Sequence, residues 1–80
     1  MITFEFEGKQ FEADEDVLTD YEFVADILEA DEEPKALIRA FRTLFNGRDR
    51  EYARMVGGKL AKMGELLRAA FAAAGDGAKN

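Results

Sequence analysis

The chain of 80 residues contains no histidine, cysteine, serine or tryptophan. These absences exclude the thiol, serine–histidine and cysteine–histidine nucleophiles of many enzymes, as well as zinc sites built from cysteine and histidine. They also exclude disulfide bonds, and a chain of this length buries only ~60% of the surface that it exposes when unfolded. We therefore expect one small domain that uses its apolar residues for its own core or for a partner.

Long apolar runs are also lacking, because charged residues interrupt every hydrophobic stretch within a few positions. A membrane-spanning helix would need roughly 18 or more consecutive apolar residues. The first residues show neither the basic start nor the apolar centre of a secretory signal. We expect a cytoplasmic protein without a membrane partner.

Alternating apolar residues predict a β-hairpin over about residues 2–13. Ile2, Phe4 and Phe6 alternate with polar residues, and Phe11 lies in a second short run that follows Gly8. Gly8 can adopt the positive φ that a tight hairpin turn requires. Because an isolated two-stranded ribbon is only marginally stable, we expect helices to cover its apolar face.

Apolar residues at helical spacing predict four helices after the hairpin, over about residues 20–30, 34–46, 49–56 and 59–74. We interpret residues 1–75 as a single domain and residues 76–80 as a flexible tail. The predicted fold class is α+β and mostly α-helical, with a short N-terminal β-hairpin packed on a three- to four-helix bundle.

The starts of the first two helices carry local signals. Thr19 and Glu22 have the spacing of a capping box, and Pro34 suits the first turn of the second helix. The first helix has a broad predicted core face, which consists of Tyr21, Phe23, Val24, Ile27 and Leu28.

Charge is divided unevenly along the chain. Residues 1–33 hold 13 acids and one base, whereas residues 34–80 hold four acids and ten bases. One interpretation is that the acidic stripe of the first helix lies beside the basic stripe of the second within one molecule. The other is a head-to-tail contact, in which the acidic face of one copy meets the basic face of the next in a homo-oligomer.

A basic band with an interleaved tyrosine lies in the middle of the chain. The candidate surface for a partner or for self-association combines this band with the acidic stripe: Arg39, Arg42, Arg48, Arg50, Arg54, Glu22, Asp26, Glu29, Tyr52 and Met55. Such a band is typical of nucleic-acid binding, so a small phage or bacterial nucleic-acid-binding regulator is an alternative function. The net charge of −6 disfavours binding to a polyanion.

Two further groups of residues have side chains that could form a binding site. Met55, Met63 and Phe71 are candidates for a pliable apolar groove or, alternatively, fill gaps in the core. The acidic segments 12–16 and 31–33 lack the spacing of a calcium-binding loop, and the remaining acids follow exposed patterns. We predict no catalytic residue, no metal ion and no cofactor, and hence no enzymatic activity.

The order of motifs over about residues 8–74 is informative. It begins with an F-x-G-K-x-F-like ribbon and T-D-Y-E-F-V, which opens an acidic helix. D-E-E-P then precedes an L-I-x-x-F-x-x-L-F-x-G helix, and a short D-x-E-Y segment leads to a last amphipathic helix. This order resembles the tail assembly chaperones of long-tailed bacteriophages and prophages.

The resemblance implies a non-enzymatic helper in the host bacterial cytoplasm. Such a protein binds the tape-measure protein and keeps it soluble until tail-tube subunits polymerise around it, and it is absent from the mature virion. The implied partners are the tape-measure protein and, at the stage of polymerisation, the tail-tube protein.

Overall fold

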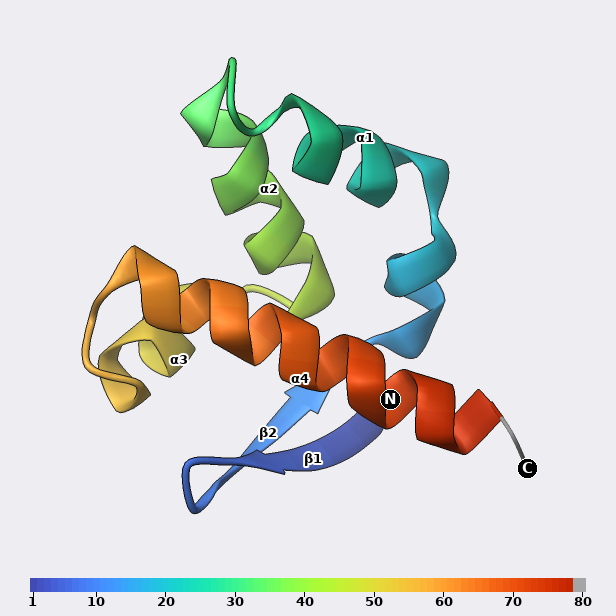
Figure 1. Ribbon diagram of the computed structural model, residues 1–80, viewed down its shortest axis with the longest axis vertical. Helices are drawn as coiled ribbons and strands as arrows, with labels where there is room; N and C mark the ends of the chain where they lie inside the picture. Colours follow the sequence, from blue (N-terminus) through green and yellow to red (C-terminus); the bar gives the residue numbers. More distant parts are fainter. Residues whose placement is uncertain (79–80) are drawn as a thin grey trace.

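A computed structural model of the chain describes residues 1–78. The elements are the strands β1 (Ile2–Phe6) and β2 (Lys9–Ala13), the 3₁₀-helix η1 (Glu15–Thr19), and the helices α1 (Tyr21–Glu29), α2 (Pro34–Leu44), α3 (Asp49–Met55) and α4 (Leu60–Ala78). The hairpin lies at one end of the molecule and the α1–α2 pair at the other, with α4 crossing beside the hairpin (Figure 1). The predicted α+β, mostly helical fold with an N-terminal hairpin is confirmed.

The hairpin closes through a two-residue turn at Glu7 and Gly8. Phe6 pairs with Lys9, and both turn residues have positive φ, 52° and 79°. This is the type I′ geometry, whose twist matches that of the strands. Phe4 lies opposite Phe11 in the antiparallel register, so the predicted hairpin and the predicted role of Gly8 are both confirmed.

Tyr52 connects the helices to the hairpin. Its side chain is 1% exposed and makes edge-to-face contacts with Phe11 and Phe45, at centroid distances of 4.9 and 5.2 Å. Its hydroxyl accepts a hydrogen bond from the backbone N–H of Glu12 at 3.1 Å. The core around it contains Phe4, Leu18, Phe23, Phe41, Leu44, Val56, Met63 and Leu66. The hairpin therefore packs on the helices through aromatic rings and one buried hydroxyl.

Left-handed residues end both α2 and α3. Asn46 and Gly47 follow α2 with φ of 53° and 82°, and the N–H of Gly47 donates to the carbonyl of Arg42 at 2.8 Å. Gly57 and Gly58 repeat this arrangement after α3. These are Schellman motifs, which satisfy carbonyls that the last turn of a helix leaves free.

The predicted capping box at the start of α1 is wrong. Thr19 ends η1, and its hydroxyl donates to the carbonyl of Asp16 at 3.4 Å. Asp20 is the residue before α1, and its side chain makes no capping hydrogen bond. Asp14 caps η1 instead, because its side chain accepts from the N–H of Asp16. Because Thr19 is the last residue of η1 and its hydroxyl bonds within that turn, it does not cap α1.

The last helix is longer than predicted. α4 continues to Ala78, four residues beyond the predicted helix end at residue 74, and so includes residues 76–78 of the predicted tail. Alanine is the strongest helix former, and the alanine-rich run before Gly75 favours continuation through the glycines. The last two residues of the predicted tail, 79 and 80, lie outside the described residues.

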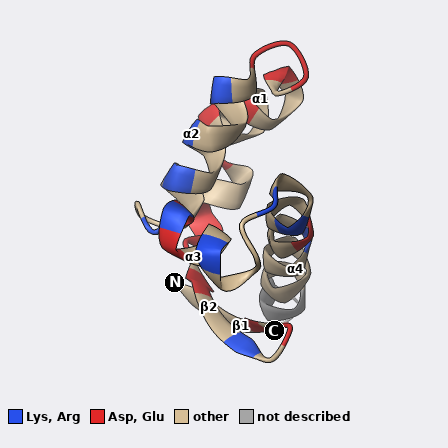
Figure 2. Ribbon diagram, turned by 90° about the vertical axis from the view of Figure 1, so that its left-hand side faces the viewer, with Lys and Arg blue, Asp and Glu red and all other residues tan. Residues whose placement is uncertain are grey.

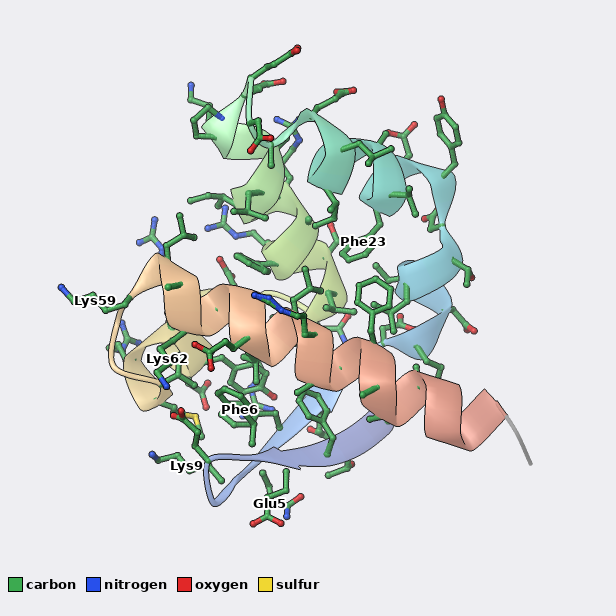
Figure 3. The ribbon with its side chains drawn as sticks, viewed as in Figure 1. Glu5, Phe6, Lys9, Phe23, Lys59 and Lys62 are labelled. Carbon is green, nitrogen blue, oxygen red and sulfur yellow. The ribbon has the colours of Figure 1, made fainter. Side chains whose placement is uncertain are left out.

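The predicted core face of α1 is only partly correct. Phe23 is buried and points towards α4 (Figure 3), and Ile27 is partly buried. Tyr21, Val24 and Leu28 are exposed. The apolar arc of α1 is wider than the surface that the rest of this small domain offers it, so one side of the arc stays outside the core.

Two glycine substitutions test the assigned backbone conformations, one at a left-handed residue after α3 and one inside helix α4. Gly57→Ala should lower the free energy of unfolding by about 1 kcal/mol, because its φ of 98° is unfavourable for a residue with a Cβ. Gly64→Ala, inside α4 with open space around the added carbon, should raise it by up to about 1 kcal/mol. Urea unfolding measures both, and equal effects would contradict the assignment.

Candidate functional site

The acidic stripe of α1 faces the basic stripe of α2 within one molecule. Arg39 donates to Asp26 at 3.1 Å and to Glu33 at 3.4 Å. The hydrogen bond to Asp26 and then that to Glu33 raise the pKa of the Arg39 guanidinium. Of the two interpretations of the charge division, the intramolecular one is therefore confirmed for this pair. A cleft lies between α1 and α2, and Glu22 and Glu29 line it without an ion pair among the described residues.

Two more arginines of the basic band are held by carboxylates. Arg42 donates through two nitrogens to both oxygens of Asp49, at 3.3 and 3.4 Å, and Asp49 is buried in the first turn of α3. Arg48 contacts Glu51 at 2.9 Å and Glu12 at 3.3 Å. Its guanidinium also lies 4.9 Å from the centre of the Tyr52 ring. Much of the band therefore serves the fold itself.

Three exposed cations in or next to the basic band have no ion pair among the described residues. They are Arg50 and Arg54 on α3 and Lys59 before α4. Figure 2 shows basic segments on α2 and α3 on the same side of the molecule, with acidic segments in the loop between α1 and α2. The part of the predicted band that is available to a partner is thus confined to α3 and the loop after it.

Two members of the predicted partner surface lie elsewhere. Tyr52 is in the core, so it cannot contact a partner, and its helical spacing gave no sign that its hydroxyl would bind the hairpin. Met55 is partly buried against the core. Met63 is buried as well, which supports gap filling, whereas Phe71 is 44% exposed.

An apolar groove lies beside Phe71. It is bounded by the start of β1, by η1 and by the C-terminal half of α4, and has a volume of about 630 Å³. We call it the η1–α4 groove; its lining residues are Ile2, Glu15, Asp16, Leu18, Thr19, Phe71, Ala74 and Gly75. Apolar side chains form most of the surface, and the two carboxylates lie together in η1. Only Phe71 was among the groove candidates from the sequence.

A second, smaller groove of about 250 Å³ lies where α2, α3 and the start of α4 meet. We call it the α3–α4 groove, and its apolar residues include Ile38, Ala53, Leu60 and Met63. Ile38 is half exposed and Leu60 is 64% exposed. The unpaired cations Arg50 and Lys59 also line it, so an apolar surface here adjoins positive charge.

Metal-ligating side chains do not gather in groups of three or more anywhere in the described part of the chain. Within the same residues, no helix has both the length and the apolar character needed to cross a membrane.

The contact between Arg48 and Glu51 can be measured through the titration of Glu51. Its hydrogen bond to Arg48 lowers the pKa of Glu51, so the pair stabilises the fold above the ordinary pKa of a glutamate. That contribution should disappear as the pH falls through the lowered pKa. In Arg48→Gln, carboxyl NMR should show the pKa of Glu51 moving up towards its ordinary value.

Arg54→Gln is the matched control, because Arg54 acts on Glu51 only through weaker, longer-range attraction. A Glu51 pKa that moves no further in Arg48→Gln than in Arg54→Gln would contradict the contact.

The chain was also compared with known proteins. No protein-family model, no curated protein and no solved structure matches it.

Proposed function

We propose that this chain is a non-enzymatic binding protein, a tail assembly chaperone of a long-tailed bacteriophage or prophage. In this proposal it binds the tape-measure protein in the host cytoplasm, keeps it soluble until the tail-tube protein assembles around it, and is absent from the mature virion. The motif order over residues 8–74 supports the proposal. The structural observation that carries it is the apolar η1–α4 groove, with the 44% exposed ring of Phe71 in its lining.

The groove suits an amphipathic helix as its occupant. A helix that lays its apolar face in such a groove is a common mode of recognition, and the anchoring side chains lie three or four residues apart. Two carboxylates adjoin the apolar lining. Glu15 pairs with the N-terminal amine at 2.8 Å, whereas Asp16 has no ion pair among the described residues, so Asp16 favours a client segment with a basic residue beside its apolar anchors. Removing the apolar face of such a segment from water is what would keep an aggregation-prone client in solution.

The state of the carboxylates supports a function without catalysis. General acid–base catalysis relies on a group whose pKa is moved towards neutral pH by burial or by neighbouring charge. Asp49 is the one buried carboxylate among those whose exposure the structure describes, and it is held by both oxygens against Arg42. This pair has a structural role at the start of α3.

The alternative of a nucleic-acid-binding regulator has less support. Arg39, Arg42 and Arg48 are occupied by carboxylates of the same molecule. Within the basic band, neutralising phosphates would require these pairs to break or would depend on Arg50, Arg54 and the adjoining Lys59.

We expect the purified protein to show no retention on a DNA column at about 0.05 M salt, where phosphate contacts are strongest. Salt-sensitive retention that is lost in the double variant Arg50→Glu, Arg54→Glu would favour the regulator and contradict the chaperone proposal. The double variant Glu22→Lys, Glu29→Lys reports what a general change of net charge does to retention.

Client binding is tested by co-expression with the tape-measure protein of the same phage or prophage genome, followed by co-purification of the soluble fraction. We expect a soluble complex with the wild type. Phe71→Asp should return most of the client to the insoluble fraction and weaken the binding of an isolated client segment by about tenfold or more, because it places a charge in the groove.

Ala72→Asp is the matched control: it adds the same charge to the next residue of α4, which is exposed and is not part of the groove lining. A client that stays insoluble with the wild type, or equal behaviour of the two variants, would contradict the proposed groove.

A further inference from the structure

The exposed side of α1 forms an apolar ridge. Tyr21, Val24 and Leu28 follow each other at helical spacing i, i+3, i+7, and Tyr21 and Leu28 are 82% and 77% exposed. Glu22 and Glu29 are exposed on the neighbouring side of the helix and have no ion pair in the described residues. We call the three apolar residues Tyr21, Val24 and Leu28 the α1 ridge. It is an amphipathic helical surface bordered by negative charge.

The α3–α4 groove has the opposite character. Ile38 and Leu60 expose apolar surface there, and Met63 lies beneath them as part of the core. Arg50 and Lys59 border it, and Lys59 extends away from the body of the molecule at the start of α4 (Figure 3). An apolar helix face with flanking carboxylates matches this groove both in polarity and in charge.

We propose that the α1 ridge of one copy docks in the α3–α4 groove of a second copy. The two surfaces consist of different residues, so the contact is heterologous and leaves each copy with one further ridge or groove to extend the assembly. The internal pair of Asp26 and Arg39 takes no part in it, because these side chains already satisfy each other. The proposal goes beyond the chaperone function and uses none of the η1–α4 groove.

The charge division explains why a second copy is the occupant. Among residues 1–75, the acids without an ion pair lie between residues 5 and 32, on the hairpin, η1, α1 and the adjoining loops. Three of the six bases without an ion pair, Arg50, Arg54 and Lys59, lie together on α3 and just before α4. Docking of ridge on groove brings Glu22 and Glu29 towards Arg50 and Lys59. Every copy therefore carries both halves of a complementary contact in equal amounts.

Self-association is measured by sedimentation equilibrium and light scattering from about 10 µM to about 1 mM protein. This range covers the dissociation constants of weak protein–protein contacts. We expect the mean mass to rise with concentration. Raising the salt from about 0.05 to about 0.5 M should lower it, because the flanking charges are exposed.

Two variants remove the halves separately. Leu28→Lys places a positive charge on the apolar ridge, and Leu60→Glu places a negative charge in the apolar groove. Each should raise the dissociation constant by about tenfold or more. Both side chains are exposed, so the helical circular dichroism should not change. Gln10→Lys and Ala72→Glu make the same charge changes at exposed residues outside both surfaces and should associate like the wild type.

Mixing the two variants gives the decisive result. Leu28→Lys keeps its groove and Leu60→Glu keeps its ridge, so an equimolar mixture should form a one-to-one heterodimer and stop there. A wild type that stays monomeric at about 1 mM, variants that associate normally, or a mixture without heterodimer would each overturn the proposal. A failure here leaves Phe71-dependent client solubility unaffected, so the two proposals are tested separately.

Discussion

The burial of Tyr52 beneath the hairpin is the contact on which the rest of this fold depends. A two-stranded ribbon is not stable alone, and here Phe11 of β2 meets Tyr52 of α3 and, through it, Phe45 after α2. The hydroxyl also satisfies the backbone N–H of Glu12, which points away from β1. One side chain thus contacts both the Phe11 ring and the polar edge of the hairpin, which brings residues 11, 45 and 52 into a single core.

A core of this size cannot take in every apolar side chain of the chain. Those that remain outside are grouped on particular elements: Phe71 beside η1, Tyr21 and Leu28 on α1, and Leu60 at the start of α4. The charged side chains divide similarly into two sets. Pairs such as Arg42 with Asp49 lie within the fold, whereas unpaired charges such as Arg50 and Lys59 border exposed apolar groups. We propose that these exposed apolar groups bind partners, whereas the core around Tyr52 stabilises the fold.

Local signals made the elements predictable from sequence, whereas the faces of the helices were not. Gly8 indicated the hairpin turn and Pro34 the start of α2, because turn and cap chemistry depends on a few neighbouring residues. The side of α1 that meets the core depends on how α2 and α4 pack, so the exposure of Tyr21 and Leu28 could not be read from spacing alone. The sequence allowed both an intramolecular and a head-to-tail interpretation of the charge division, and only the side-chain positions showed which charges pair within one molecule.

We propose that two separate outer surfaces bind two different partners while the core stays unchanged. Amide NMR spectra of the labelled protein test it most directly, in a dilution series and with an added helical segment of the tape-measure protein. We expect dilution to shift the signals of α1, α3 and the start of α4, and the segment to shift those of η1 and the C-terminal half of α4. Shifts of the same residues in both series, or shifts centred on Phe11 and Tyr52, would contradict it.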